Sequence, residues 1–227
     1  MTNSIDGYIL LNKPYGWTSF DCVSYIKRKY KLKKVGHAGT LDPIATGLLL
    51  IMIGKATKYF DHFQKNIKAY DATLLLGAEF DSGDITGKLK EFSPPDSPPV
   101  KEDVLKALNS FIGETIQIPP QHSALKIKGK SAYKYAREGI DVKMTPRKVF
   151  IDKIDLLKYE FPHITFRIFC KKGFYVRSLC MDIAEKLHTK GVMTALSRIK
   201  QSGHSIEETW SLKDLPENIE EVLLPVG

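Results

Sequence analysis

Six consecutive apolar residues, LLLIMI at positions 48–53, limit most strongly what this chain can fold into. Gly47 and Gly54 bound the run, which therefore has the length of a strand rather than of a helix. A strand without polar positions has to be covered on both of its faces. The run is also far too short to cross a bilayer. The sequence thus predicts a buried strand in a domain with one sizeable core.

Apolar spacing predicts a strand, a turn and a helix before this run. Pro14 and Gly16 end the apolar segment 7–13, and Thr18 or Ser19 can cap the helix that follows. The helix is expected to bury four residues: Phe20, Val23, Ile26 and Tyr30.

Later segments change between strand and helix periods without a regular βαβ alternation. Strand patterns cover 69–77, 164–170 and 192–199, and helical patterns cover 55–65, 104–112 and 179–187. Arg177 falls at a junction between strand and helix. These patterns predict the α+β class, with one mixed sheet flanked by helices.

Positive charge is concentrated in two segments. The chain has 34 basic and 26 acidic residues, which gives a net charge of +8. This balance fits a polyanionic partner, although a charge that only aids solubility fits equally well. Residues 27–34 contain six basic side chains, and residues 124–139 interleave lysines with tyrosines, whereas the segment after residue 206 is acidic. The uneven distribution favours a basic face for nucleic acid.

Several site classes are disfavoured by their missing motifs. The three cysteines, Cys22, Cys170 and Cys180, are odd in number and lack CxxC spacing, so we expect reduced core thiols and no metal site. A P-loop and a GxGxxG pattern are both missing, which disfavours a nucleotide cofactor. The N-terminus has no signal pattern, so a cytoplasmic protein that does not contact a membrane is expected.

The loop GHAGTLDPIATG, residues 36–47, allows two readings from spacing alone. In the first it is a tight turn, in which its three glycines supply positive φ and Asp42 bonds to its own backbone. In the second Asp42 is a catalytic nucleophile. Pro43 is expected to hold Asp42 in an extended conformation in either case. The glycines at issue are Gly36, Gly39 and Gly47.

Five motifs in this order closely resemble the TruB family of tRNA pseudouridine synthases. They are KPYGWTSFD, VGHAGTLDPIATGLLLIMIGKATK, KAYDATLLLG, IPPQHSALKIKGKSAYKYAREG and KKGFYVRSLCMDIAEKL. The resemblance runs from about residue 7 to the end of the chain. It implies a pseudouridine synthase catalytic fold over 1–227, with a mainly antiparallel central sheet. It also implies isomerisation of uridine 55 in the T-loop of tRNA, without a metal or another cofactor.

The resemblance assigns three catalytic residues. Asp42 would break the N-glycosidic bond as a nucleophile or base, after which the uracil rotates and bonds to the sugar through C5. Arg177 would lie beside Asp42 and keep it ionised. Tyr70 would lie against the target base and move a proton.

Further residues are assigned to substrate binding. His37 would stack in the T-loop where the target base is turned out. Lys13 would support the aspartate loop or the RNA backbone, and Tyr175 and Leu196 would line the uracil pocket. Many relatives have tyrosine where this chain has His122, and no large effect is expected.

A basic segment at about 121–148 corresponds to a thumb-like RNA-binding insertion of the family, and its Lys128 and Lys130 would neutralise phosphates. Longer bacterial relatives add a PUA domain, and no complete PUA domain is expected here. The expected partner is the T-arm of tRNA, bound by a monomer without a guide RNA.

Two other functions fit parts of the same sequence. A non-catalytic RNA-binding or tRNA-folding module would explain the basic segments, but it would have no need for Asp42. A catalytic subunit of a guide-RNA complex would be expected to carry a PUA domain and further extensions.

Overall fold

The computed structural model describes residues 5–123, 125–127 and 129–226. It contains two compact units, of which the first comprises Met1–Tyr70 with Ser197–Gly227 and the second comprises Asp71–Leu196. The chain passes between the units within two strands, β4 (Lys68–Leu76) and β12 (Gly191–Gln201). The interpretation of 1–227 as one catalytic domain stays a prediction.

The apolar run forms the central strand of the first unit. It lies in β3 (Thr46–Ile53), which pairs along one edge with β1 (Gly7–Lys13) in antiparallel register. Along its other edge β3 pairs with β2 (Val35–Ala38), antiparallel, and with the last part of β12, parallel. All six residues of the run are at most 2% exposed. The predicted buried strand is confirmed.

The first helix, α1 (Ser19–Lys29), begins at the predicted cap. Thr18 and Asp21 form a reciprocal capping box. The buried face repeats at intervals of three and four residues and consists of Ser19, Cys22, Val23 and Ile26. Phe20 lies on the opposite face and is 70% exposed, so its predicted burial was wrong.

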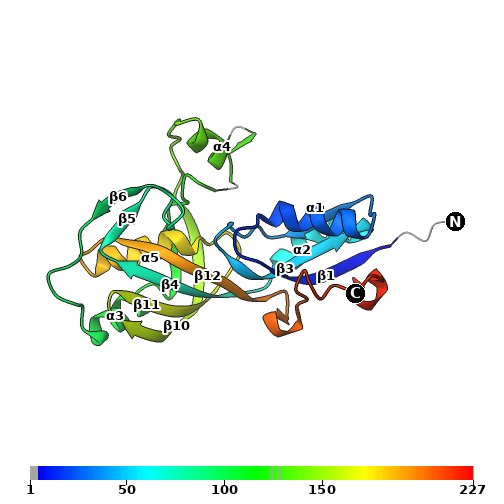
Figure 1. The fold of residues 1–227 in the computed structure, drawn as a ribbon. Coiled ribbons are helices and arrows are strands. Elements are labelled where there is room, and N and C mark those ends of the chain that lie inside the picture. The colour runs from blue at the N-terminus through cyan, green and yellow to red at the C-terminus, as the bar shows by residue number, and fades with distance from the viewer. Residues whose placement is uncertain (1–4, 124, 128, 227) are drawn as a thin grey trace. The chain divides into compact units, whose positions relative to one another are not determined.

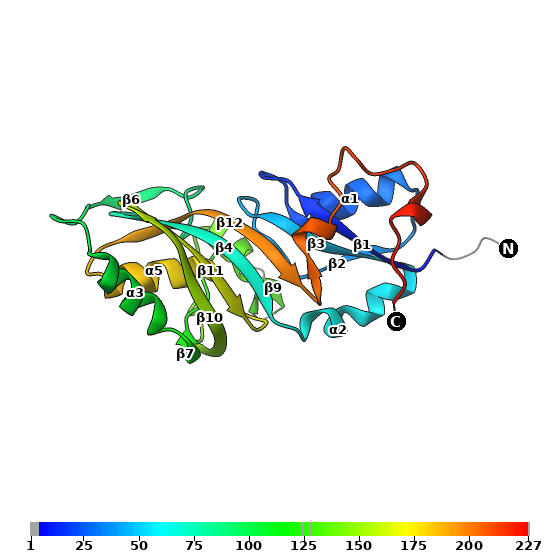
Figure 2. The ribbon, with the colours of Figure 1, turned by 90° about the horizontal axis from the view of Figure 1, so that it is seen from below.

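The other face of these strands is covered by a short 3₁₀ helix, η1 (Gly54–Tyr59), and by α2 (Phe60–Gln64). Figure 2 shows α1 and α2 on opposite sides of β1, β2 and β3. The core on the α2 side comprises Leu10, Ala38, Leu50, Met52, Ala56 and Phe63. The C-terminal segment adds β13 (His204–Ser205), η2 (Ile206–Glu208) and η3 (Ile219–Glu221), and Leu224 and Val226 pack against this core.

The second unit consists of strands in the order β12, β4, β11, β10 and β7. Strands β11 (His163–Cys170) and β7 (Gly113–Gln117) both run antiparallel to β10 (Arg147–Glu160). Two helices, α3 (Lys101–Asn109) and α5 (Val176–Lys186), cover one face of these strands (Figure 2). Ile164, Phe166 and Ile168 of β11 are fully buried, as their alternation predicted.

Two hairpins complete the second unit. The first joins β5 (Ala78–Phe80) to β6 (Leu89–Phe92). The second joins β8 (Lys126–Ile127) to β9 (Lys130–Ser131) and leads into the short helix α4 (Ala132–Arg137). In Figure 1 the second hairpin and α4 extend away from the strands of their unit.

The predicted α+β class with a mixed, mainly antiparallel sheet is confirmed, since β12 pairs with β3 in parallel, whereas the pairs β1–β3, β2–β3, β10–β11 and β7–β10 are antiparallel. The three cysteines are buried and free, as expected. In the part of the chain that the structure describes, no helix is both long and apolar enough to span a membrane.

Candidate functional site

Asp42 occupies the first position of a turn between β2 and β3. The turn is closed by a hydrogen bond of 3.0 Å that the Ala45 amide donates to the Asp42 carbonyl. Pro43 takes the second position, where its fixed φ is favoured. The side chain of Asp42 is half-buried. The turn interpretation of this loop is therefore right for the backbone around Asp42.

The start of α1 holds this turn in place. The Ser19 hydroxyl donates to the Leu41 carbonyl at 3.2 Å and accepts from the Leu41 amide at 2.8 Å. The Gly16 amide donates to the Pro43 carbonyl at 2.8 Å. Residues on both sides of Asp42 are thus bonded to the segment that precedes the helix.

Lys13 is fully buried beneath the same turn. Its ammonium donates to the carbonyls of Pro14 at 2.9 Å, Trp17 at 2.5 Å and Pro43 at 3.4 Å. Burial lowers the pKa of Lys13 to about 8, and the neighbouring Asp42 opposes that shift. By the same interaction the ammonium favours the ionised form of Asp42. The expected support of the aspartate loop by Lys13 agrees with its bond to Pro43.

Two side chains from β12 hold the loop from its other side. Arg198 is 1% exposed and donates to the carbonyls of Leu48 at 2.7 Å and Gly39 at 3.1 Å. Gln201 is fully buried and donates to the carbonyl of Ala38 at 2.6 Å. No sequence motif pointed to either residue, because backbone carbonyls as acceptors leave no signature in the sequence.

The glycines of the loop have different roles. Gly39 and Gly47 adopt positive φ, at +91° and +96°. A Cβ on Gly47 would lie 2.4 Å from the Arg198 carbonyl, and one on Gly39 would lie 3.0 Å from Gln64. Gly36 is an ordinary residue of β2, so its predicted positive φ was wrong. Gly39 and Gly47 are required here for close packing inside the protein.

His37 lies on β2, one strand residue before Ala38. Its Nδ1 is buried without a hydrogen-bond partner. Burial lowers the pKa of His37, and the charge of Arg198 lowers it further. The imidazole is therefore held in its neutral form, which suits stacking on a base better than a cation that needs hydration. Tyr70 lies in β4 and is half-buried. The first unit ends at Tyr70, and the second begins at Asp71.

Arg177 is the second residue of α5 and is 3% exposed. It donates to the carbonyls of Ser82 at 2.8 Å and His122 at 2.6 Å. Its Nη1 lies 3.6 Å from a carboxylate oxygen of Asp84, which is also buried. No role was assigned to Asp84 from the sequence, because its contact with Arg177 joins two distant segments of the chain. Because His122 contributes its carbonyl, the exchange of tyrosine for histidine leaves this contact intact.

Tyr175 precedes α5 and is fixed at two points. Gln117, which is buried, accepts from the Tyr175 amide at 2.8 Å and donates to its carbonyl at 3.0 Å. The guanidinium of Arg147 lies 4.9 Å from the centre of the Tyr175 ring. Leu196 is 8% exposed and is the last residue of the second unit.

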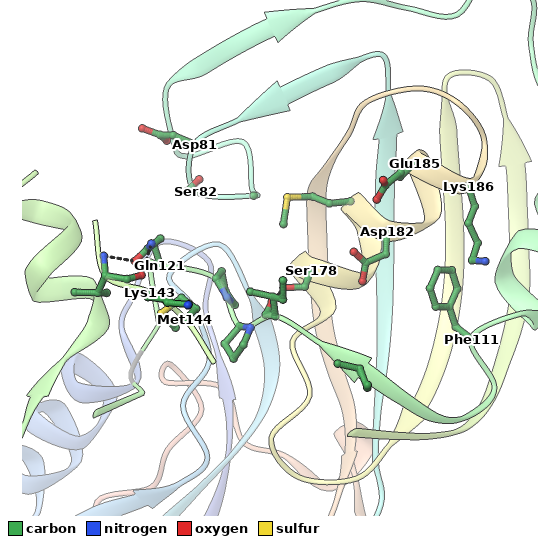
Figure 3. Close-up of a pocket in the computed structure, with 17 residues that line it drawn as sticks. Asp81, Ser82, Phe111, Gln121, Lys143, Met144, Ser178, Asp182, Glu185 and Lys186 are labelled. Carbon is green, nitrogen blue, oxygen red and sulfur yellow. Dashed lines mark hydrogen bonds between the residues drawn. The ribbon is translucent and has the colours of Figure 1, made fainter. Parts of the chain in front are cut away.

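A cleft of about 860 Å³ lies against α5 (Figure 3). Ser82 lines it together with side chains of α5, among them Ser178, Asp182 and Glu185. Burial raises the pKa of Asp182 to about 6, and the charge of Glu185 adds to the shift. None of these four side chains was assigned a role from the sequence, because a polar face on a helix is ordinary for a globular protein.

The thumb lysines are only partly described. Lys130 forms an ion pair of 2.5 Å with Glu138 and lies 4.6 Å from the centre of the Tyr135 ring. Lys128 lies outside the described residues. The structure thus gives Lys130 a partner within its own hairpin and helix.

The candidate residues are divided between the two units. Lys13, His37, Asp42 and Tyr70 belong to the first, and Lys130, Tyr175, Arg177 and Leu196 belong to the second. The pairing of Asp42 with Arg177 stays a prediction. Among residues 5–123, 125–127 and 129–226, no group of three His, Cys, Asp or Glu side chains could hold a metal ion.

Sequence comparisons identify similar proteins over nearly the whole chain. The family model of the N-terminal domain of TruB family pseudouridylate synthases matches residues 27–176. The tRNA pseudouridine synthase B of Clostridium tetani (strain Massachusetts / E88) is 46% identical over 223 residues, which are 97% of this chain and 76% of that protein. The protein of the same name from Limosilactobacillus reuteri (strain DSM 20016) is 42% identical over 218 residues, 93% of this chain and 72% of that protein.

Solved structures with the same fold include chains of larger complexes. A chain of a Cbf5-Nop10-Gar1 complex superimposes with a TM-score of 0.71 at 29% identity, over 92% of this chain and 53% of that chain. A chain of an H/ACA RNP bound to a substrate RNA containing 2′-deoxyuridine gives 0.68 at 27% identity, over 92% and 52%. The present chain spans about half the length of these two chains.

Proposed function

Because the chain belongs to the TruB family of pseudouridylate synthases, we propose that it isomerises uridine 55 to pseudouridine in the T-loop of tRNA. The observation that carries the proposal is the Asp42 turn, which lies within the matched family region. This turn is held by bonds from Lys13, Ser19 and Arg198. A carboxylate on a fixed backbone is what an attack at a single sugar carbon requires.

The reaction breaks one bond and forms another without a net change in atoms. Ionised Asp42 acts as nucleophile or base, and the bond between C1′ and N1 of uridine breaks. The detached uracil rotates, and its C5 bonds to C1′. The proton lost from C5 is balanced by one gained at N1, and Tyr70 moves a proton in this exchange.

The remaining candidate residues are proposed to position the substrate. His37 stacks in the T-loop where uridine is turned out, because reaction at a base requires its extrusion. Tyr175 and Leu196 line the uracil pocket, and Arg177 keeps Asp42 ionised. The bonds of Arg177 to Ser82 and His122 support this role, since they fix its guanidinium before substrate arrives.

Residues 121–148 are proposed to form an RNA-binding thumb, in which Lys128 and Lys130 neutralise phosphates. We further propose that the protein acts as a monomer in the cytoplasm and without a guide RNA. The relatives at 42–46% identity are tRNA enzymes, whereas the RNP subunits are 27–29% identical.

The test compares Asp42→Asn with Asp61→Asn, which makes the same change at an exposed aspartate of the first unit. Each protein is incubated with a T-arm stem-loop, and pseudouridine is read by carbodiimide labelling and primer extension. Asp42→Asn should bind the RNA as the wild type does and form no pseudouridine, and Asp61→Asn should remain active. Full activity of Asp42→Asn would contradict the assignment. RNA binding by the wild type without product would favour the tRNA-folding module.

A further inference from the structure

We infer that Arg198 is a positioning residue of the reaction, which fixes the backbone on both sides of Asp42. This inference rests on the proposed function. It assigns a role to a residue of β12 that lies 156 positions from Asp42 in the sequence.

The position of Arg198 makes it a clamp between the two ends of the loop. Its Nε donates to the carbonyl of Leu48, which follows the loop, and its Nη2 donates to the carbonyl of Gly39, within the loop. One planar guanidinium thus sets the separation of two backbone points on either side of Asp42. Lysine, with a single ammonium, cannot reproduce this fork.

The loop is shaped to accept this clamp. Gly47 brings its backbone so close to β12 that a Cβ there would lie 2.4 Å from the Arg198 carbonyl. A Cβ on Gly39 would lie 3.4 Å from Nη1 of the same residue. Both glycines adopt positive φ, which the clamp requires and which other residues reach only with strain. The close approach of Arg198 therefore explains Gly47, and together with Gln64 it explains Gly39.

The charge of Arg198 has a second consequence. In the described part of the chain no carboxylate forms an ion pair with Arg198, which donates to the neutral carbonyls of Leu48 and Gly39. A buried charge without a counter-ion acts on its surroundings through a low dielectric. It lowers the pKa of His37, where burial is the larger cause and Arg198 is the one charged contributor. The same charge contributes to the lowered pKa of Lys13.

Three variants separate position from charge. Arg198→Lys keeps the charge and loses the fork, and Arg198→Met loses both. Gln201→Met removes a neutral donor to the Ala38 carbonyl and serves as the matched control for lost backbone bonds. The measurements are kcat and KM on a T-arm stem-loop, thermal unfolding, and the pKa of His37 from NMR titration of its ring protons.

We expect Arg198→Met to lower kcat on the order of 100-fold, as misplacement of a reacting group does, with KM changed little. The pKa of His37 should rise in Arg198→Met and remain low in Arg198→Lys and Gln201→Met. Arg198→Lys should recover part of kcat. If Arg198→Met does not fold, the low pKa of His37 together with a reduced kcat in Arg198→Lys still supports the inference.

Two outcomes would overturn it. In the first, folded Arg198→Met or Arg198→Lys keeps the kcat of the wild type. In the second, Gln201→Met raises the pKa of His37 as much as Arg198→Met does, which would make the effect one of general loosening. Failure of the proposed function is seen separately, since the wild-type protein would then form no pseudouridine at all.

Discussion

The Asp42 loop and the thumb segment both carry glycines and lie near basic residues, yet they are built in opposite ways. Around the loop, the cations Lys13 and Arg198 are buried and donate to backbone carbonyls. In the thumb, Lys130 is partly exposed and pairs with a carboxylate of the same segment. Buried cations fix a backbone, whereas exposed ones remain able to exchange partners. The comparison teaches that a fixed backbone and an exposed charged surface place different demands on positive charge.

The largest expected effect is on the free energy of unfolding, when glycine is replaced by alanine in the Asp42 loop and, for comparison, in the thumb. Gly47→Ala combines positive φ with a close approach to Arg198, and Gly129→Ala combines positive φ with open space. We expect a loss of unfolding free energy of about 3 kcal/mol or more for Gly47→Ala and about 1 kcal/mol for Gly129→Ala. Urea unfolding of both proteins measures the difference. Equal losses would show that the loop is no more tightly packed than the thumb.

The titration of Lys13 should make both the free energy of unfolding and the activity depend on pH, an effect smaller than that of Gly47→Ala. Below pH 8 its amine is charged in the folded and the unfolded protein. Between about 8 and its usual value of 10.5, the unfolded chain binds a proton that the folded protein has lost, so this group stabilises the fold increasingly as pH rises. Activity should move in the opposite direction, because the neutral amine holds the Pro43 carbonyl more weakly.

The check is a pH series on the wild type and on Lys13→Met. Between pH 8 and 10.5 the difference in unfolding free energy should shift in favour of the wild type, while the kcat of the wild type falls. A difference that is independent of pH would mean that the pKa of Lys13 is not lowered in the folded protein.

The smallest effect on fold and chemistry is expected in the thumb. The double variant Lys128→Ala with Lys130→Ala should weaken RNA binding and reduce the slope of log affinity against log salt by roughly 1 to 2. Its unfolding free energy should change by less than about 0.5 kcal/mol. Glu138→Gln, which frees Lys130 from its partner, should not weaken binding. An unchanged slope in the double variant would place the RNA contacts elsewhere.

Much of the fold could be predicted because its signals are local. The run in β3, the Thr18 cap of α1 and the alternation in β11 each follow from neighbouring residues, and each prediction is confirmed. Membership of the TruB family, inferred from motifs, is confirmed by the comparisons. The burial of Phe20 was wrong because its spacing of three from Val23 fits a helical stripe, whereas the buried face continues from Val23 to Cys22 and Ser19.

The supports of the candidate site could not be predicted in the same way. Arg198, Gln201 and Asp84 act through contacts that join distant parts of the chain, and the acceptors are often backbone carbonyls. Such acceptors are present at every residue, so the sequence does not mark them. Gly36 shows the converse, because a motif glycine was assigned a positive φ that only its neighbours Gly39 and Gly47 adopt.

The central claim is that Asp42, on its fixed turn, converts uridine 55 of tRNA to pseudouridine. Its most direct test is the mapping of pseudouridine in total tRNA from a strain that lacks its own enzyme and expresses either the wild-type protein or Asp42→Asn. We predict pseudouridine at position 55 with the wild type and unmodified uridine with the variant. Modification by both proteins, or by neither, would contradict the account.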